Sequence, residues 1–130
     1  MAEKKKRAMK LRPVEAQVQQ FAVLGEMTGL LQRVRVNKSK RTESGLLKTG
    51  PFRITVVALD TGGQLQDHAV DGPFTVQCLL GRVALSIGGR EHRLTTGDVL
   101  VAEAAIRHDI SAEDASVLLL TVAAAGALKE

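Results

Sequence analysis

Short runs of β-branched and aliphatic residues, separated by glycine, occupy the second half of this chain and constrain its fold more than any other feature. Between His68 and His108 the runs are ended by Gly81, by the pair Gly88-Gly89 and by Gly97. Such runs are typical of half-buried strands joined by tight turns. Their short, even spacing favours an antiparallel barrel or sandwich over βαβ units.

This punctuation predicts most of the secondary structure. Gly88-Gly89 has the composition of a two-residue hairpin turn. Nearer the N-terminus, apolar spacings of three and four predict a helix from Pro13 to about Gly29, although Gly25 and Gly29 each cost roughly 1 kcal/mol relative to alanine. We expect an edge strand at 31–36, a loop at 37–45, and strands at 52–59, 65–69, 74–80, 82–87, 90–94, 99–102, 107–111 and 117–122.

The length of the chain allows one domain. Its 130 residues are 45% hydrophobic, enough for a single core. We divide it into a disordered basic tail (1–12), a helix, edge strand and loop (13–45), the barrel (46–123) and a frayed C-terminus (124–130). The single cysteine, Cys78, cannot form an internal disulfide, so we expect a cytoplasmic protein. No apolar run approaches the ~20 residues of a membrane span, so we expect no membrane partner.

Charge is divided unevenly along the chain. Residues 1–41 hold eleven Lys and Arg against three Glu, and residues 42–130 hold seven against eleven Asp and Glu. The acidic remainder argues against nucleic-acid binding by the barrel itself. The run Lys4–Arg7, with Lys10 and Arg12, is either a solvated, extended tail or an arm that touches phosphate in a salt-sensitive way.

The spacing of glycines and histidines resembles the cupin superfamily, in particular its small single-domain bacterial members, over about residues 46–123. In the first cupin motif, Gly62 or Gly63 opens, His68 falls on the first histidine, and Gly81 closes. Val70 stands at the second histidine and Phe74 at the glutamate. In the second motif, Gly97 and His108 are in register, while Glu103 and Ala105 replace the usual proline and glycine.

The resemblance implies an all-β fold, the double-stranded β-helix or jelly-roll barrel, with a short N-terminal helix. It also implies a homodimer, as is common among cupins. We expect a small-molecule ligand in a barrel pocket lined by His68, Val70, Phe74, Val76 and His108. No catalytic residue is identified.

Three functions stay open at this point. The first is small-molecule binding in a barrel whose metal site is degenerate. The second is a metal-dependent cupin enzyme, an isomerase or dioxygenase, in which His68 and His108 bind one divalent transition metal such as Fe, Mn, Ni, Zn or Cu. The third is an accessory or regulatory protein that uses its basic arm.

Several other residues have a simpler interpretation. His92 flanks the hairpin and is expected on the surface. Cys78 shares the phase of Val76 and is expected to be a small buried hydrophobe. Glu103 and Asp109 flank the second motif and could act as a general base near His108, although exposed carboxylates on a barrel rim are commoner.

Overall fold

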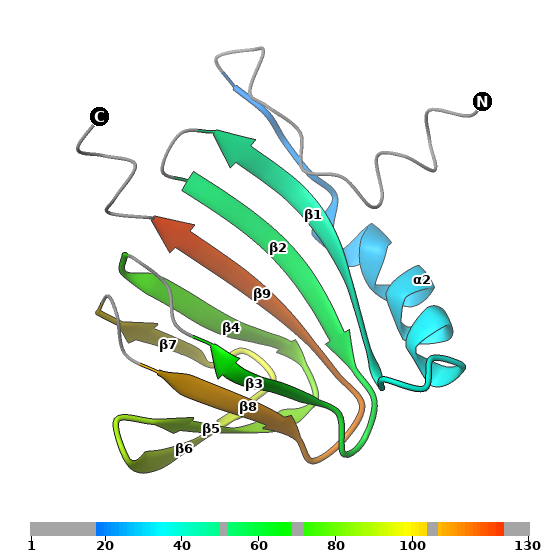
Figure 1. Ribbon diagram of the computed structural model, residues 1–130. Helices are drawn as coiled ribbons and strands as arrows, with labels where there is room; N and C mark the ends of the chain where they lie inside the picture. The colour runs from blue at the N-terminus through cyan, green and yellow to red at the C-terminus, as the bar shows by residue number, and fades with distance from the viewer. Residues whose placement is uncertain (1–17, 50–51, 69–71, 104–106, 124–130) are drawn as a thin grey trace.

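A computed structural model describes residues 18–49, 52–68, 72–103 and 107–123, and shows two antiparallel sheets with one helix beside them (Figure 1). One sheet has the order β1-β2-β9-β4-β7 and the other β3-β8-β5-β6. The elements are α2 (Val23–Arg35), β1 (Arg41–Thr49), β2 (Phe52–Leu59), β3 (Gln64–His68), β4 (Phe74–Leu80), β5 (Arg82–Ile87), β6 (Arg90–Thr95), β7 (Val99–Ala102), β8 (His108–Ala112) and β9 (Ser116–Ala123).

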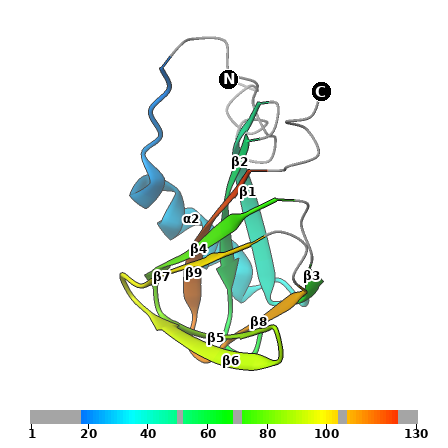
Figure 2. The same ribbon diagram turned by 90° about the vertical axis from the view of Figure 1, so that its left-hand side faces the viewer.

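The two sheets face each other, as the turned view in Figure 2 shows. Their inner faces enclose the main apolar core, in which strand residues alternate between inside and outside. In β4, for example, Phe74, Val76 and Cys78 point inward and are buried, and Gln77 lies out of phase with them and is only partly buried. The antiparallel architecture expected from the glycine punctuation, and the all-β barrel implied by the resemblance, are therefore confirmed.

The helix α2 packs on the outer face of the five-stranded sheet, against β1, β2 and β9. Leu30 and Val34 form a second apolar cluster there with Val56, Ala58 and Val117. The strand β2 is buried on both faces at its end, because Val57 and Leu59 enter the barrel core while their neighbours contact the helix layer. This explains its unbroken apolar run.

The prediction for 13–45 was wrong in three places. Residues 18–22 are not helical, residues 31–35 belong to α2 and not to an edge strand, and β1 begins at Arg41 within the expected loop. Met27, Leu30, Leu31 and Val34 recur at helical spacing and bury the helix on the sheet, which outweighs the cost of Gly25 and Gly29. Residues 13–17 lie outside the described residues.

One end of the barrel, which we call the turn end, is closed by hydrogen bonds between turns. There the Gly62 N–H donates to the Ala112 carbonyl and the Ala112 N–H to the Gly63 carbonyl, both at 2.9 Å. The Gly81 N–H donates to Thr96 Oγ1 at 3.0 Å. The Arg82 N–H donates to Ser116 Oγ at 3.0 Å. Gly81 has a φ of +103°, and a Cβ there would contact the Ala115 carbonyl oxygen at 2.6 Å, so glycine is required.

Candidate ligand groove

His108 lies at the opposite end of the barrel, which we call the groove end, and its side chain is buried. The residue is 4% exposed, and its imidazole stacks on the ring of Phe74, with ring centroids 4.4 Å apart and planes inclined by 25°. Such offset pairs add about 0.5–1.5 kcal/mol beyond the area that they bury. The stack therefore joins the two sheets, because Phe74 belongs to β4 and His108 to β8.

A groove of about 500 Å³ opens at this end, between the edge strands β6 and β7 of the two sheets. Ile87 is directly opposite His108 in the β5–β8 register, and Ala102 is directly opposite Phe74 in the β4–β7 register. Residues opposite each other across a pair share a face, so the groove adjoins the Phe74–His108 stack. It is lined by Ile87, Gly88, Arg90, His92, Leu100, Val101, Ala102 and Glu103.

Arg90 and His92 supply polar groups on the β6 side of the groove. They pair with the buried residues Ile87 and Leu85, so their side chains start from the inner face of the sheet and remain exposed only because β6 is an edge strand. Among the described residues Arg90 has no ion-pair partner, while Arg93, on the other face of the same strand, pairs with Glu91 at 3.2 Å and Glu113 at 3.5 Å.

The predicted pocket residues fall into three groups. Phe74 and His108 are brought together at the groove end, as described above. Val76 lies deeper and is fully buried in the core, packed among apolar side chains. Val70 and the side chain of His68 lie outside what the structure describes, although the His68 backbone is opposite His108 in the β3–β8 register.

The described side chains around His108 do not by themselves supply a ligand set for a transition metal. Such ions in proteins usually take several nitrogen, sulfur or carboxylate ligands from the chain. In the described part of the chain no three His, Cys, Asp or Glu side chains gather closely enough to hold a metal ion. At the position of the cupin glutamate, Phe74 presents an apolar ring to the imidazole. Metal binding by His68 and His108 stays a prediction, and we derive no chemical step through a metal.

Cys78 is buried at the turn end and is not built as a nucleophile. Its Sγ lies 3.5 Å from the carbonyl oxygens of Leu80 and Gly81. Burial raises the pKa of the thiol, which the hydrogen bond to Leu80 only partly offsets. A raised pKa leaves little of the reactive thiolate at neutral pH, which agrees with the expectation of a small buried hydrophobe.

Sequence reasoning missed the groove because its two walls come from strands that do not pair with each other. His92 is exposed, as expected for a hairpin flank, and also lines the groove. The alternation of side chains along β6 could have revealed it. Leu94 is apolar and buried, so His92 and Arg90, two and four residues before it, lie on the same face of the strand.

Comparison of the fold with solved structures gives many matches. A conserved protein of unknown function from Streptococcus pyogenes is 25% identical with a TM-score of 0.65, over 87% of this chain and 92% of that one. An RmlC-like cupin protein from Desulfovibrio desulfuricans is 21% identical with a TM-score of 0.66, over 82% and 97%. A cupin superfamily protein from Desulfitobacterium hafniense is 14% identical with a TM-score of 0.65, over 88% and 97%.

Sequence-based comparisons add no further assignment. No family model matches the chain, and no curated protein matches it. Within the described residues, no helix is long and apolar enough to cross a membrane.

Proposed function

This chain is a small cupin-fold protein, and we propose that it binds a small organic carboxylate in the groove between β6 and β7. The observation that carries the proposal is the groove itself, which is apolar along Ile87, Leu100 and Ala102 and has Arg90 at its edge. Its volume of about 500 Å³ lies within the usual range for small-molecule sites, roughly 300–1,000 Å³.

The groove offers separate places for the two parts of such a ligand. The apolar body would lie along the β7 wall toward the Phe74–His108 stack, where apolar surface is removed from water. The carboxylate would lie at Arg90, whose guanidinium can donate two parallel hydrogen bonds to it. His92 is two residues along the same strand, about 7 Å away on the same face, and can donate a further hydrogen bond. Glu103 lies on the β7 side and disfavours a second negative charge at that position.

Benzoate and its neutral counterpart benzamide test this proposal as probes. Amide chemical shifts of the full-length protein are followed by NMR while each probe is added. We expect benzoate to shift resonances of β6 and β7 and to bind more tightly than benzamide. Arg90→Gln should weaken benzoate binding by about tenfold or more, because it removes the charge-assisted pair of hydrogen bonds at a partly exposed site, and should leave benzamide binding unchanged.

Two further variants distinguish binding in the groove from an effect of the protein's net charge. Arg93→Gln removes the same charge from the same strand but from the other face, so benzoate affinity should be retained. Ala102→Leu fills the groove and should weaken both probes. If neither probe shifts β6 and β7 resonances, or if Arg93→Gln is as harmful as Arg90→Gln, the proposed site is wrong.

A further inference from the structure

Five basic side chains gather at the turn end of the molecule, where α2 is joined to β1. The helix contributes Arg33 and Arg35 to its last turn. The connecting turn and the start of β1 contribute Lys38, Lys40 and Arg41. We call this set of five residues the basic corner. In the structure's described residues none of the five has an ion-pair partner within 4.0 Å, whereas Arg82 and Arg93 are both paired with acids.

Helix stability explains only part of this charge. Cations in the last turn interact favourably with the helix dipole, which accounts for Arg33 and Arg35. The other three follow the helix and have no such role. The dipole therefore leaves most of the corner unexplained.

The turn that carries Lys38 and Lys40 is held in one conformation by hydrogen bonds. The Ser39 N–H and hydroxyl both donate to Asn37 Oδ1, at 3.0 and 2.8 Å. The Lys40 N–H donates to the Asn37 carbonyl, and the Lys40 carbonyl accepts from the Asp60 N–H, both at 3.0 Å. The cations are thus presented from a fixed backbone, which lowers the entropy cost of binding.

Lys40 itself has a left-handed backbone, with a φ of 61°. It is the one residue other than glycine with a positive φ in the described part of the chain. Glycine and asparagine adopt this conformation far more readily than lysine does. Strained backbones of this kind are enriched at functional sites.

Two of the five residues border a hollow on the surface. Arg33 and Lys38 line a depression of about 580 Å³ together with Val36, Asn37 and Thr42. This depression lies at the opposite end of the barrel from the ligand groove. Arg41 pairs with the last residue of β2, Leu59, at the turn end. The first residue of β2, Phe52, pairs with Ala123, next to the partner of Phe74 at the groove end. The depression is therefore a separate site.

We propose that the basic corner binds the phosphate backbone of double-stranded nucleic acid without reading its sequence. Unpaired Lys and Arg side chains supply this kind of binding by releasing counterions. None of the five residues nor any residue lining the depression is aromatic, so bases of a single strand would find no stacking platform. One exposed valine, Val36, is too little apolar surface to insert into a lipid interface.

The number of cations in the corner favours a polyanion over a single phosphate group. A duplex carries a phosphate every ~3.4 Å along each strand and can contact several of the five side chains at once, whereas a single phosphate group cannot.

Fluorescence anisotropy with a labelled duplex DNA of arbitrary sequence tests the proposal on the full-length protein. The key variant is Lys38→Gln/Lys40→Asn, in which asparagine suits the left-handed backbone and should preserve the fold, as a thermal melt will check. Since each phosphate contact contributes about 0.9 to the slope of log affinity against log salt, we expect the slope to fall by about 2. Affinity at low salt should fall at least tenfold.

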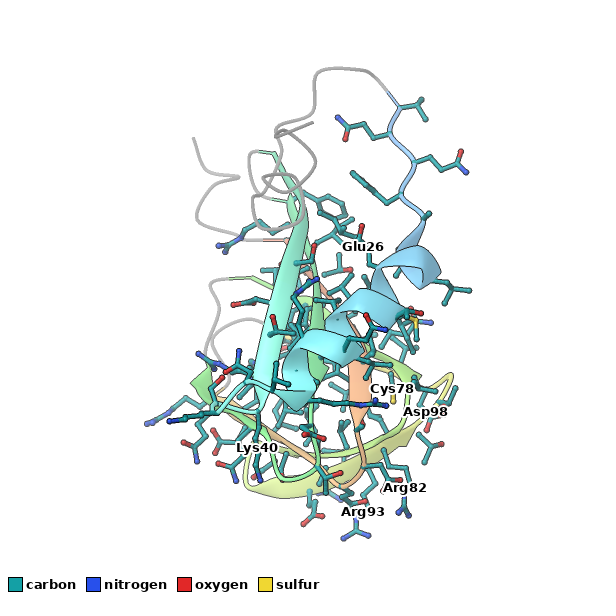
Figure 3. All side chains as sticks on the ribbon, turned by 90° about the vertical axis from the view of Figure 1, so that its right-hand side faces the viewer. Glu26, Lys40, Cys78, Arg82, Arg93 and Asp98 are labelled. Carbon is teal, nitrogen blue, oxygen red and sulfur yellow. The ribbon has the colours of Figure 1, made fainter. Side chains whose placement is uncertain are left out.

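The matched control is Arg82→Gln/Arg93→Gln, which removes the same net charge from β5 and β6; Figure 3 shows both arginines at the same end as Lys40 but well to its right. It should bind the duplex as the wild type does. Equal losses in the two double variants would show a bulk-charge effect and overturn the proposal. Retained binding by the corner variant, with binding lost on deletion of residues 1–12, would assign the contact to the tail alone and also overturn it. No binding by the wild type, or binding only to vesicles that contain phosphatidylserine, would contradict it as well.

Discussion

The two ends of the barrel share one apolar core but differ in the contacts that close them. At the turn end, backbone groups of neighbouring turns are hydrogen-bonded to each other and to Thr96 and Ser116. At the groove end, the described structure has one stacked ring pair and an open groove. Hydrogen-bonded turns define strand register and add stability, whereas unfilled concave surface adds none and is available to a ligand. We infer that the hydrogen-bonded turns stabilise the fold at the turn end, and that the proposed small-molecule site lies at the groove end.

The largest expected effect comes from adding one methyl group at the turn end. Gly81→Ala places a Cβ against the Ala115 carbonyl and Ser116, at a φ of +103°. Left-handed strain and the backbone contact together should lower the free energy of unfolding by about 3 kcal/mol or more. Urea denaturation measures this directly.

Gly88→Ala is the matched change at the groove end. Gly88 also has a positive φ, 58°, but a Cβ there meets no atom within 4 Å. Its cost should be only about 1 kcal/mol. Equal costs for the two variants would mean that the two ends do not differ in the way we describe.

A smaller effect is expected from Ser116→Ala, also at the turn end. Ser116 is fully buried, accepts from the Arg82 N–H, and lies 2.7 Å from the Asp114 carbonyl oxygen, to which its hydroxyl donates. Removing the hydroxyl leaves the Arg82 N–H without its acceptor, which should cost about 1–3 kcal/mol. Ser86→Ala, on the exposed face of β5, is the control and should change stability by less than about 0.5 kcal/mol.

At the groove end we expect Phe74→Leu to cost less stability than Gly81→Ala. Leucine keeps most of the apolar volume but loses the stack on His108, worth about 1 kcal/mol. Benzoate affinity should fall at the same time, because the inner end of the groove adjoins that ring. Phe52→Leu, at a partly exposed ring of β2, should leave benzoate binding unchanged. If Phe74→Leu binds benzoate as tightly as the wild type does, the stack does not contribute to the site.

Most of the barrel could be predicted from the sequence because its signals are local. β2, β4, β5 and β7 begin and end at the predicted residues, and the Gly88-Gly89 hairpin is present with both φ values positive. Each of these boundaries depends on a glycine or turn residue a few positions away. The segment 31–36 was mistaken for a strand because Arg33 and Arg35 alternate with Val34 and Val36, and only packing on the sheet favours the helix.

The candidate sites were less predictable because they depend on contacts between distant segments. The stack of Phe74 on His108 joins residues from two sheets. The groove between β6 and β7 exists because the edges of those sheets lie close together without pairing. For the basic corner, the sequence showed the excess charge within residues 1–41, and the structure places five of those cations on the folded part of the chain.

The smallest expected effect concerns an exposed ion pair that adds to the turn end. Arg82 Nε lies 2.7 Å from Asp114 Oδ2, and this hydrogen bond holds the pKa of the Asp114 carboxyl below its ordinary value of 3.8. A carboxyl whose pKa is lower in the folded state stabilises the fold once it is ionised in both states. The contribution is therefore fully present above about pH 5, and it disappears as the pH falls through the lowered pKa.

Asp114→Asn isolates this contribution. We expect the variant to be slightly less stable than the wild type at pH 7 and equally stable near pH 2, when urea denaturation is compared across that range. Both side chains are about half exposed, so 1 M salt should shrink the difference at pH 7. A difference that persists at pH 2 would mean that the aspartate acts through the turn at 113–115 and not through its charge, and the ion pair would then add no stability to the turn end.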